Sequence, residues 1–176
     1  VWSPDGKEIA FYSNRTDTYG IWTVKPDGSG LRPVTERSGG NERNLLYPVF
    51  SPAGDRLVAS RLRANETIAV DPRREWKAQK PDVLQMTVSA DTWLVPSAWS
   101  PDGRRLVGTV VNTAGSSIGV GVYDVATRTA RSVTDGASGF LGFVWLSDSR
   151  RAAYVDLANR TIWLATIAPG DDIADP

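Results

Sequence analysis

The amino-acid sequence predicts an all-β fold made of repeated antiparallel units, and three observations lead to this prediction. An aromatic residue followed by Ser, Pro, Asp and Gly starts residues 2–6 and returns, with changes, three more times. The aromatic positions are Trp2, Phe50, Trp99 and Trp145, so successive repeats are offset by 48, 49 and 46 positions. Short apolar runs follow each box, and no long segment has helical periodicity. Four-stranded units with a period of about forty to fifty residues are typical of β-propeller blades.

The repeated box has the chemistry of a tight turn between two antiparallel strands. Pro presets φ, Asp accepts hydrogen bonds from nearby backbone N–H groups, and Gly adopts a positive φ without a Cβ clash. In the second box Ala53 stands where the others have Asp, and the fourth box has lost both Pro and Gly. The residues expected to shape these turns are Pro4, Asp5, Gly6, Pro52, Gly54, Pro101, Asp102 and Gly103.

The strands expected in each unit are named A to D in chain order. In the first unit the strands fall at residues 9–12, 20–24 and 31–35, with a Pro-Asp-Gly-Ser-Gly turn before the last. The other units place strands at 47–50, 57–59, 95–99, 106–108, 118–123, 130–134, 152–155 and 161–165. The D-to-A connections at 36–44, 85–94 and 135–142 vary in length and content, and we expect loops there. Variable loops on a rigid scaffold are where recognition is normally built.

The repeat period divides the chain into about four four-stranded antiparallel blades. The units lie near residues 1–45, 46–94, 95–142 and 143–168, and an acidic tail or linker follows at 169–176. The first unit lacks strand A and the last lacks strand D, so these two cannot complete one common blade. We therefore expect these blades to be a fragment of a larger ring, and the remainder of that ring is an expected partner.

Aromatic residues that recur at the repeat period are expected in the cores of the blades, because recurrence at equivalent positions indicates packing. Trp76 and Trp93 break this period. They could be exposed anchors for a partner or could fill irregular packing in the second unit, and the pattern favours packing. The recurring aromatic residues are Trp2, Trp22, Phe50, Trp99, Trp145 and Trp163.

Composition excludes several classes of function. The chain has 20 basic and 20 acidic residues and a formal net charge of zero, so we expect no binding to nucleic acid. It contains no Cys and no His, which excludes thiolate nucleophiles and Ser-His-Asp triads. Residues 115–119 match the G-x-S-x-G hydrolase pattern, but without a His base we interpret Ser117 as a loop residue. We expect no catalytic residues, cofactor or metal ligands, and no membrane insertion by this segment.

The Trp-Ser-Pro-Asp-Gly-Lys/Arg box, the apolar strand after it and the Pro-Asp-Gly-Ser-Gly turn resemble the TolB-like β-propeller repeat, a WD-like repeat. The resemblance implies a ring of six to eight blades. It also implies binding of a protein or peptide in the periplasm, or in the extracytoplasmic sensor domain of a bacterial receptor or kinase. We therefore expect a non-catalytic scaffold that recognises a protein or ligand through its D-to-A and B-to-C loops.

Two alternatives remain open from the sequence. One is a propeller that restricts substrate access to a prolyl-oligopeptidase-like serine peptidase whose catalytic domain lies outside this chain. The other is a carbohydrate-active lyase on the same fold. Lyases resembling this repeat hold a metal with His ligands, which this chain lacks. The sequence does not identify the partner.

Overall fold

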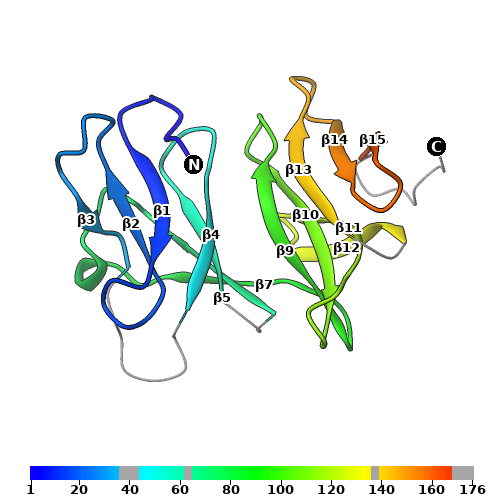
Figure 1. The fold of residues 1–176 in the computed structure, drawn as a ribbon, viewed down its shortest axis with the longest axis horizontal. Helices are drawn as coiled ribbons and strands as arrows, with labels where there is room; N and C mark the ends of the chain where they lie inside the picture. Colours follow the sequence, from blue (N-terminus) through cyan, green and yellow to red (C-terminus); the bar gives the residue numbers. More distant parts are fainter. Residues whose placement is uncertain (36–43, 62–64, 136–138, 168–176) are drawn as a thin grey trace. The chain divides into compact units, whose positions relative to one another are not determined.

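The computed structural model describes residues 1–35, 44–61, 65–135 and 139–167. These residues form four β-sheets, and their one helix is a three-residue 3-10 turn, so the all-β prediction is confirmed. The chain divides into two compact units, Val1–Leu84 and Gln85–Pro176 (Figure 1). Within the described residues, no helix has the length and hydropathy needed to cross a bilayer.

The first unit contains a three-stranded and a four-stranded sheet. The three-stranded sheet has the order β1-β2-β3, with β1 at Ile9–Ser13, β2 at Gly20–Val24 and β3 at Arg32–Pro33. The four-stranded sheet has the order β4-β5-β6-β7. Its elements are β4 (Leu45–Phe50), β5 (Leu57–Arg61), β6 (Glu66–Val70) and β7 (Asp82–Gln85), with the 3-10 turn η1 (Trp76–Ala78) before β7. Strands β1 and β2 both contact β4, which brings the two sheets together.

One hydrophobic core joins these two sheets. In β2 the burial alternates, with Ile21 and Thr23 fully buried between half-buried neighbours, as the two-residue period of a strand requires. The fully buried residues of β5 include Leu57, which faces the same core. The buried members of the cluster are Ala10, Ile21, Val34, Leu45, Phe50, Leu57, Ala59, Ile68 and Val70.

The second unit contains a five-stranded sheet of order β12-β11-β10-β9-β8 and a three-stranded sheet of order β13-β14-β15. The five strands are β8 (Thr87–Ser89), β9 (Thr92–Trp99), β10 (Arg105–Asn112), β11 (Ser117–Asp124) and β12 (Thr129–Asp135). The other three are β13 (Phe140–Trp145), β14 (Arg151–Asp156) and β15 (Thr161–Thr166). Phe140 and Phe143 pack on Tyr154 in the core of this unit, with ring centroids 5.6 and 5.9 Å from it.

The segment 85–94 was expected to be a loop, and this expectation is wrong. It contains β8 and the start of β9, which pair as an antiparallel hairpin through Thr87 and Trp93. Met86 and Leu94 at its base are almost completely buried, and the Leu94 N–H donates to the Met86 carbonyl at 2.8 Å. Alternating β-branched and polar residues on each side of a two-residue turn explain the hairpin. The expected loop at 36–44 lies outside the described residues except for Asn44, as does the tail at 169–176. The expected loop at 135–142 is wrong in part, because residue 135 ends β12 and residues 140–142 belong to β13, while 136–138 lie outside the described residues.

Candidate functional site

The turn boxes share one hydrogen-bonding pattern. In the first box the Gly6 N–H donates to the Ser3 carbonyl at 2.9 Å, and the Ser3 hydroxyl donates to Asp5 at 2.7 Å. The same hydroxyl accepts from the Glu8 N–H at 2.9 Å. The third box repeats all three bonds around Ser100, which is fully buried. The structure places Gly6, Gly54 and Gly103 at φ of 70°, 69° and 72°.

In the second and fourth boxes, other residues take the place of the missing Asp and Gly and keep the same turn geometry. In the second box Asp55 takes the role of the missing Asp and accepts from the Ser51 hydroxyl at 2.8 Å. In the fourth box Ser149 stands in the glycine position with a φ of 55°, and its N–H donates to the Leu146 carbonyl at 3.1 Å. Local hydrogen bonds thus close the turns of both altered boxes, and the Ser149 hydroxyl also accepts from the Asp102 N–H of the third box at 3.0 Å.

The box aspartates are engaged as hydrogen-bond acceptors. The Ser3 hydroxyl and the Lys7 N–H hold the pKa of Asp5 below its ordinary value. At Asp102 burial raises the pKa, but hydrogen bonds from Ser100 and from the Arg104 N–H outweigh it and lower the pKa overall. A carboxylate with a lowered pKa is a poor general acid at neutral pH. Neither is a candidate for acid catalysis.

The hydrolase-like segment 115–119 does not form a nucleophile elbow. Ser117 begins strand β11, so its interpretation as a loop residue is wrong. Its hydroxyl is buried without a hydrogen-bond partner in the described part of the chain, and no imidazole exists to activate it.

The structure buries some of the recurring aromatic residues and exposes one. Phe50, Trp99 and Trp145 are each 8% exposed, and the Trp145 indole N–H donates to the Ala98 carbonyl at 3.2 Å. The expectation for Trp2 is wrong, because its side chain is 59% exposed. Trp2 forms an isolated bridge with Ile9 and lies outside the named strands.

The two half-buried members of the recurring set lie on equivalent strands of the two units. Trp22 lies on β2, with the Arg15 guanidinium 4.7 Å from its ring centroid, which is a cation–π contact. Trp163 on β15 packs against the core of the second unit.

Trp76 and Trp93 are both partly buried. Trp76 starts η1 and packs against the core of the first unit, while part of the ring lines an open hollow. Trp93 lies in β9 and pairs with Thr87 of β8 and Val111 of β10. Trp76 is therefore the one with access to a ligand through a described cavity.

Three exposed tyrosines, Tyr12, Tyr19 and Tyr47, form a group that sequence reasoning missed, and we call it the tyrosine cluster. The ring of Tyr12 makes edge contacts with Tyr19 and Tyr47 at centroid distances of 5.8 and 5.9 Å. The three side chains are 44%, 38% and 50% exposed. Tyr19 lies in the B-to-C connection, and Asn44 at the end of the first D-to-A connection accepts a hydrogen bond from its N–H at 3.2 Å. The cluster therefore joins both kinds of loop.

Tyr47 has a backbone conformation that L-residues avoid. Its φ is 55°, which costs about 1–2 kcal/mol for a residue with a Cβ. The equivalent position of the fourth repeat, three residues before the box aromatic, is Gly142 with a φ of 64°. Both positions lie at a register shift between the first two strands of their sheets. The chain thus places a large aromatic residue at a bulge where it elsewhere uses glycine, and such strain is concentrated at functional sites.

A second feature of the first unit is an open hollow of about 1040 Å³, which we call the cationic groove. It lies among the A-to-B turns at 3–8 and 50–54, the C-to-D turn and β3 of the first sheet, and residues 72–77. These segments connect strands A to B and C to D, whereas recognition was expected in the B-to-C and D-to-A loops. Its charged lining residues are Lys7, Lys25, Arg32, Arg73, Arg74, Lys77, Asp5, Glu8 and Glu75.

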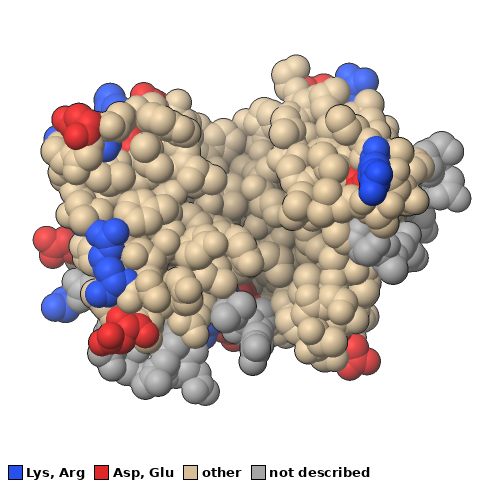
Figure 2. Space-filling model, viewed as in Figure 1, with Lys and Arg blue, Asp and Glu red and all other residues tan. Residues whose placement is uncertain are grey.

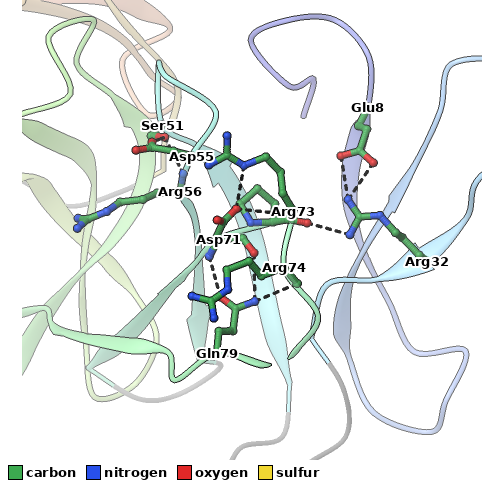
Figure 3. Close-up of polar contacts among 10 residues, drawn as sticks. Glu8, Arg32, Ser51, Asp55, Arg56, Asp71, Arg73, Arg74 and Gln79 are labelled. Carbon is green, nitrogen blue, oxygen red and sulfur yellow. Dashed lines mark hydrogen bonds and ion pairs between the residues drawn. The ribbon is translucent and has the colours of Figure 1, made fainter. Parts of the chain in front are cut away.

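Figure 3 shows how internal contacts fix the arginines of this groove. Arg32 donates to both carboxylate oxygens of Glu8 at 2.9 and 3.1 Å and to the Pro72 carbonyl at 2.8 Å, so it links the two sheets. Arg73 donates from Nε and from its backbone N–H to Asp71, both at 3.0 Å.

The segment that carries these arginines is held by a second set of contacts. The Gln79 amide accepts from the Asp71 N–H at 2.8 Å and donates to the Asp71 and Arg74 carbonyls, each at 3.1 Å. The Arg74 guanidinium donates to the Ala78 carbonyl. The cations of this side of the groove are thereby positioned in advance.

Comparison with known sequences gives one partial relative and no matching family model. An uncharacterized protein of Agrobacterium fabrum is 40% identical over 57 residues, which is 32% of this chain and 18% of that protein.

Solved structures similar to this chain are β-propeller proteins. TolB from Acinetobacter baumannii matches 95% of this chain and 42% of its own length, with 20% identity and a TM-score of 0.60. An oligogalacturonate lyase in complex with manganese matches 94% of this chain and 48% of its own, with 14% identity and a TM-score of 0.66. Dipeptidyl peptidase 4 of Porphyromonas gingivalis matches 96% of this chain and 30% of its own length, with 13% identity and a TM-score of 0.58.

These likenesses show the fold: the chain has a TolB-like β-propeller fold and spans about half or less of the length of these proteins. The lyase complex contains manganese. The described residues hold no group of three or more His, Cys, Asp and Glu that could bind a metal, and the whole sequence lacks His.

Proposed function

We propose that this chain is a non-catalytic β-propeller scaffold that recognises a protein or peptide through the loop end of its first unit. The observation that carries the proposal is the tyrosine cluster. Tyrosine supplies a large, rigid, amphipathic contact area at a low cost in side-chain entropy. The cluster lies where a B-to-C connection meets the end of a D-to-A connection, which is where variable loops were expected to build a binding surface.

The fixed backbone of this region supports a binding role. The Leu45 N–H donates to the Tyr19 carbonyl at 2.9 Å, and the Tyr19 N–H is held by Asn44. These bonds fix the backbone at Tyr19, and the edge contacts of Tyr12 with Tyr19 and Tyr47 restrict the three rings, which lowers the cost of association. The strained Tyr47 fits the same interpretation, because glycine would satisfy the bulge but would remove a contact residue.

As part of this proposal we place the chain within a ring of six to eight blades, in the periplasm or another extracytoplasmic compartment. The support is the TolB-like fold together with the resemblance of the repeat. On the face shown in Figure 2, basic and acidic side chains are interspersed and no large area has one sign of charge. A surface of this kind does not attract nucleic acid over a broad area.

A second candidate is a propeller that restricts substrate access to a serine peptidase. The likeness to dipeptidyl peptidase 4 favours it, since that enzyme contains the same fold over a part of its length. Under this alternative the catalytic domain is another part of the protein, and the blades act on substrate access alone.

A phage-displayed library of linear peptides, selected against the purified chain, tests the proposal. We expect selection to enrich peptides whose binding is lost in Tyr12→Ala and is reduced in Tyr47→Gly. The matched control is Tyr123→Phe, which alters a fully buried tyrosine of the second unit. Enrichment that is equal for wild type and both cluster variants would reject the tyrosine cluster as the recognition surface.

A further inference from the structure

We propose that the cationic groove of the first unit is a second binding site, and that its ligand is an acidic peptide in an extended conformation. Small-molecule sites have volumes of about 300–1,000 Å³. The groove, at about 1040 Å³ and open to solvent, has room for several residues of an extended chain. It lies at the A-to-B turns and C-to-D connections of the first unit and shares no residue with the tyrosine cluster.

The groove has an excess of basic side chains, although the whole chain has a formal net charge of zero. The whole sequence has 20 basic and 20 acidic residues, whereas the groove is lined by six basic and three acidic side chains. A concave surface with an excess of one sign concentrates ligands of the opposite sign and directs their approach.

The basic side chains of the groove differ in how freely they can contact a ligand. Glu8 and the Pro72 carbonyl occupy Arg32, so its role is to hold the two walls together. Arg73 is bound to Asp71 through Nε, and its side chain is still 65% exposed. The Lys7 side chain is 80% exposed, and within the described residues it makes a long ion pair with Asp5 at 3.7 Å. Lys7 and Arg73 therefore offer charge to a ligand from two different segments of the lining.

The distribution of charges distinguishes a peptide from a compact anion. Asp5, Glu8 and Glu75 lie among the basic residues of the lining. They would repel a phosphate ion that carries its charge at one point, but a flexible acidic peptide spreads its charge along its length, so some carboxylates can lie beside the cations while the others stay in solvent. The lining also offers apolar surface for the peptide backbone and side chains, from Pro33, Phe50, Pro52, Pro72 and Trp76.

Fluorescence anisotropy with the 176-residue chain and a fluorescein-labelled hexaglutamate peptide tests this site. We expect saturable binding that weakens as salt rises, and no binding of labelled hexaglutamine. The double variant Lys7→Gln/Arg73→Gln should bind about tenfold more weakly, since it removes two charged contacts. The matched double variant Arg104→Gln/Arg150→Gln, which removes two exposed charges of the second unit, should bind within about twofold of wild type.

Three controls separate the possible outcomes. The single variant Lys7→Gln alters a side chain that is 80% exposed, so its weaker binding cannot reflect unfolding. Arg73→Lys should recover part of the affinity because it restores the charge. Tyr12→Ala should bind hexaglutamate as wild type does, which keeps this test independent of the tyrosine cluster. The proposal is overturned if both double variants lose affinity equally, if hexaglutamate does not saturate, or if inorganic phosphate displaces it as well as unlabelled hexaglutamate does.

Discussion

Single residues in this protein close its turns, and we propose that others present side chains to a partner. The box serines close turns, because each hydroxyl both donates to a carboxylate and accepts from a backbone N–H. Tyr47 belongs to the proposed binding surface, and its φ of 55° would suit glycine better. The backbone strain at Tyr47 is the observation that sets it apart from the box serines.

Replacing Ser100 by Ala should lower the free energy of unfolding by about 1–3 kcal/mol, because the partly buried Arg105 N–H loses an acceptor whose residue is fully buried. Ser3→Ala should cost less, since Ser3 is only half-buried and water can replace its hydroxyl. Urea unfolding of the two variants measures the difference. Equal losses would show that burial does not decide the value of this hydrogen bond.

The strain at Tyr47 predicts an unusual order of stability. Tyr47→Gly and Tyr47→Ala lose the same ring contacts, but only alanine keeps the unfavourable φ, so the glycine variant should be the more stable by about 1 kcal/mol. Tyr12 lies on the regular strand β1, and there alanine should be the better replacement. The same order at both positions, measured by urea unfolding, would contradict the inferred strain.

At the scale of elements, the hairpin turns tolerate changes in sequence when another residue can supply the same hydrogen bond. Asp55 does this for the second box and Ser149 for the fourth. The turn between β14 and β15 departs further, because Arg160 occupies a left-handed position with a φ of 54°. These turns therefore require a residue with a positive φ. The first three boxes use glycine at this position, whereas the fourth box and the β14–β15 turn use a strained non-glycine residue.

Substitutions at these turns should change stability in opposite directions. A Cβ added at Gly103 would meet no atom within 4 Å, so Gly103→Ala should lower the free energy of unfolding by about 1 kcal/mol through φ alone. Arg160→Gly should raise it by about 0.5–1 kcal/mol for the same reason. Thermal and urea unfolding check both changes, with Arg150→Gln as a control for loss of charge. A destabilised Arg160→Gly would mean that its side chain makes a contact worth more than the strain.

At the scale of the whole molecule, titration behaviour follows from the absence of His together with the hydrogen-bonded aspartates. Asp5, Asp27 and Asp148 each accept turn hydrogen bonds that lower their pKa in the folded state. The unfolded state then binds protons more readily than the folded state. The stability that these groups provide is present above their unfolded pKa of about 3.9 and is lost as the pH falls through the lower folded pKa.

We therefore expect the urea midpoint to be constant between about pH 5 and pH 6.5 and to fall below about pH 4. Midpoints measured from pH 3 to pH 6.5 in one buffer series check this. A change centred between pH 5 and pH 6.5 would contradict it, because no side chain of ordinary pKa titrates there in a chain without His.

The sequence determined the features that depend on a few neighbouring residues. A period read from Trp2, Phe50, Trp99 and Trp145 predicted the repeated all-β units, because a tight turn needs its Pro, Asp and Gly within one short segment. The sequence-based prediction of a loop at 85–94 was wrong, because the short hairpin there has a two-residue turn without Gly or Pro to mark it. The tyrosine at position 47 could have been noticed by alignment with Gly142, since both precede their box aromatic by three residues.

The tertiary structure alone decided which residues meet. The tyrosine cluster joins side chains from β1, its following loop and β4, and the cationic groove joins residues 3–8 with residues 72–77. The exposure of Trp2 was likewise settled by what packs beside it, although its sequence context matches that of the buried Trp99. Local preferences act over a few residues, whereas contacts between sheets depend on how whole strands pack, and no short motif records that packing.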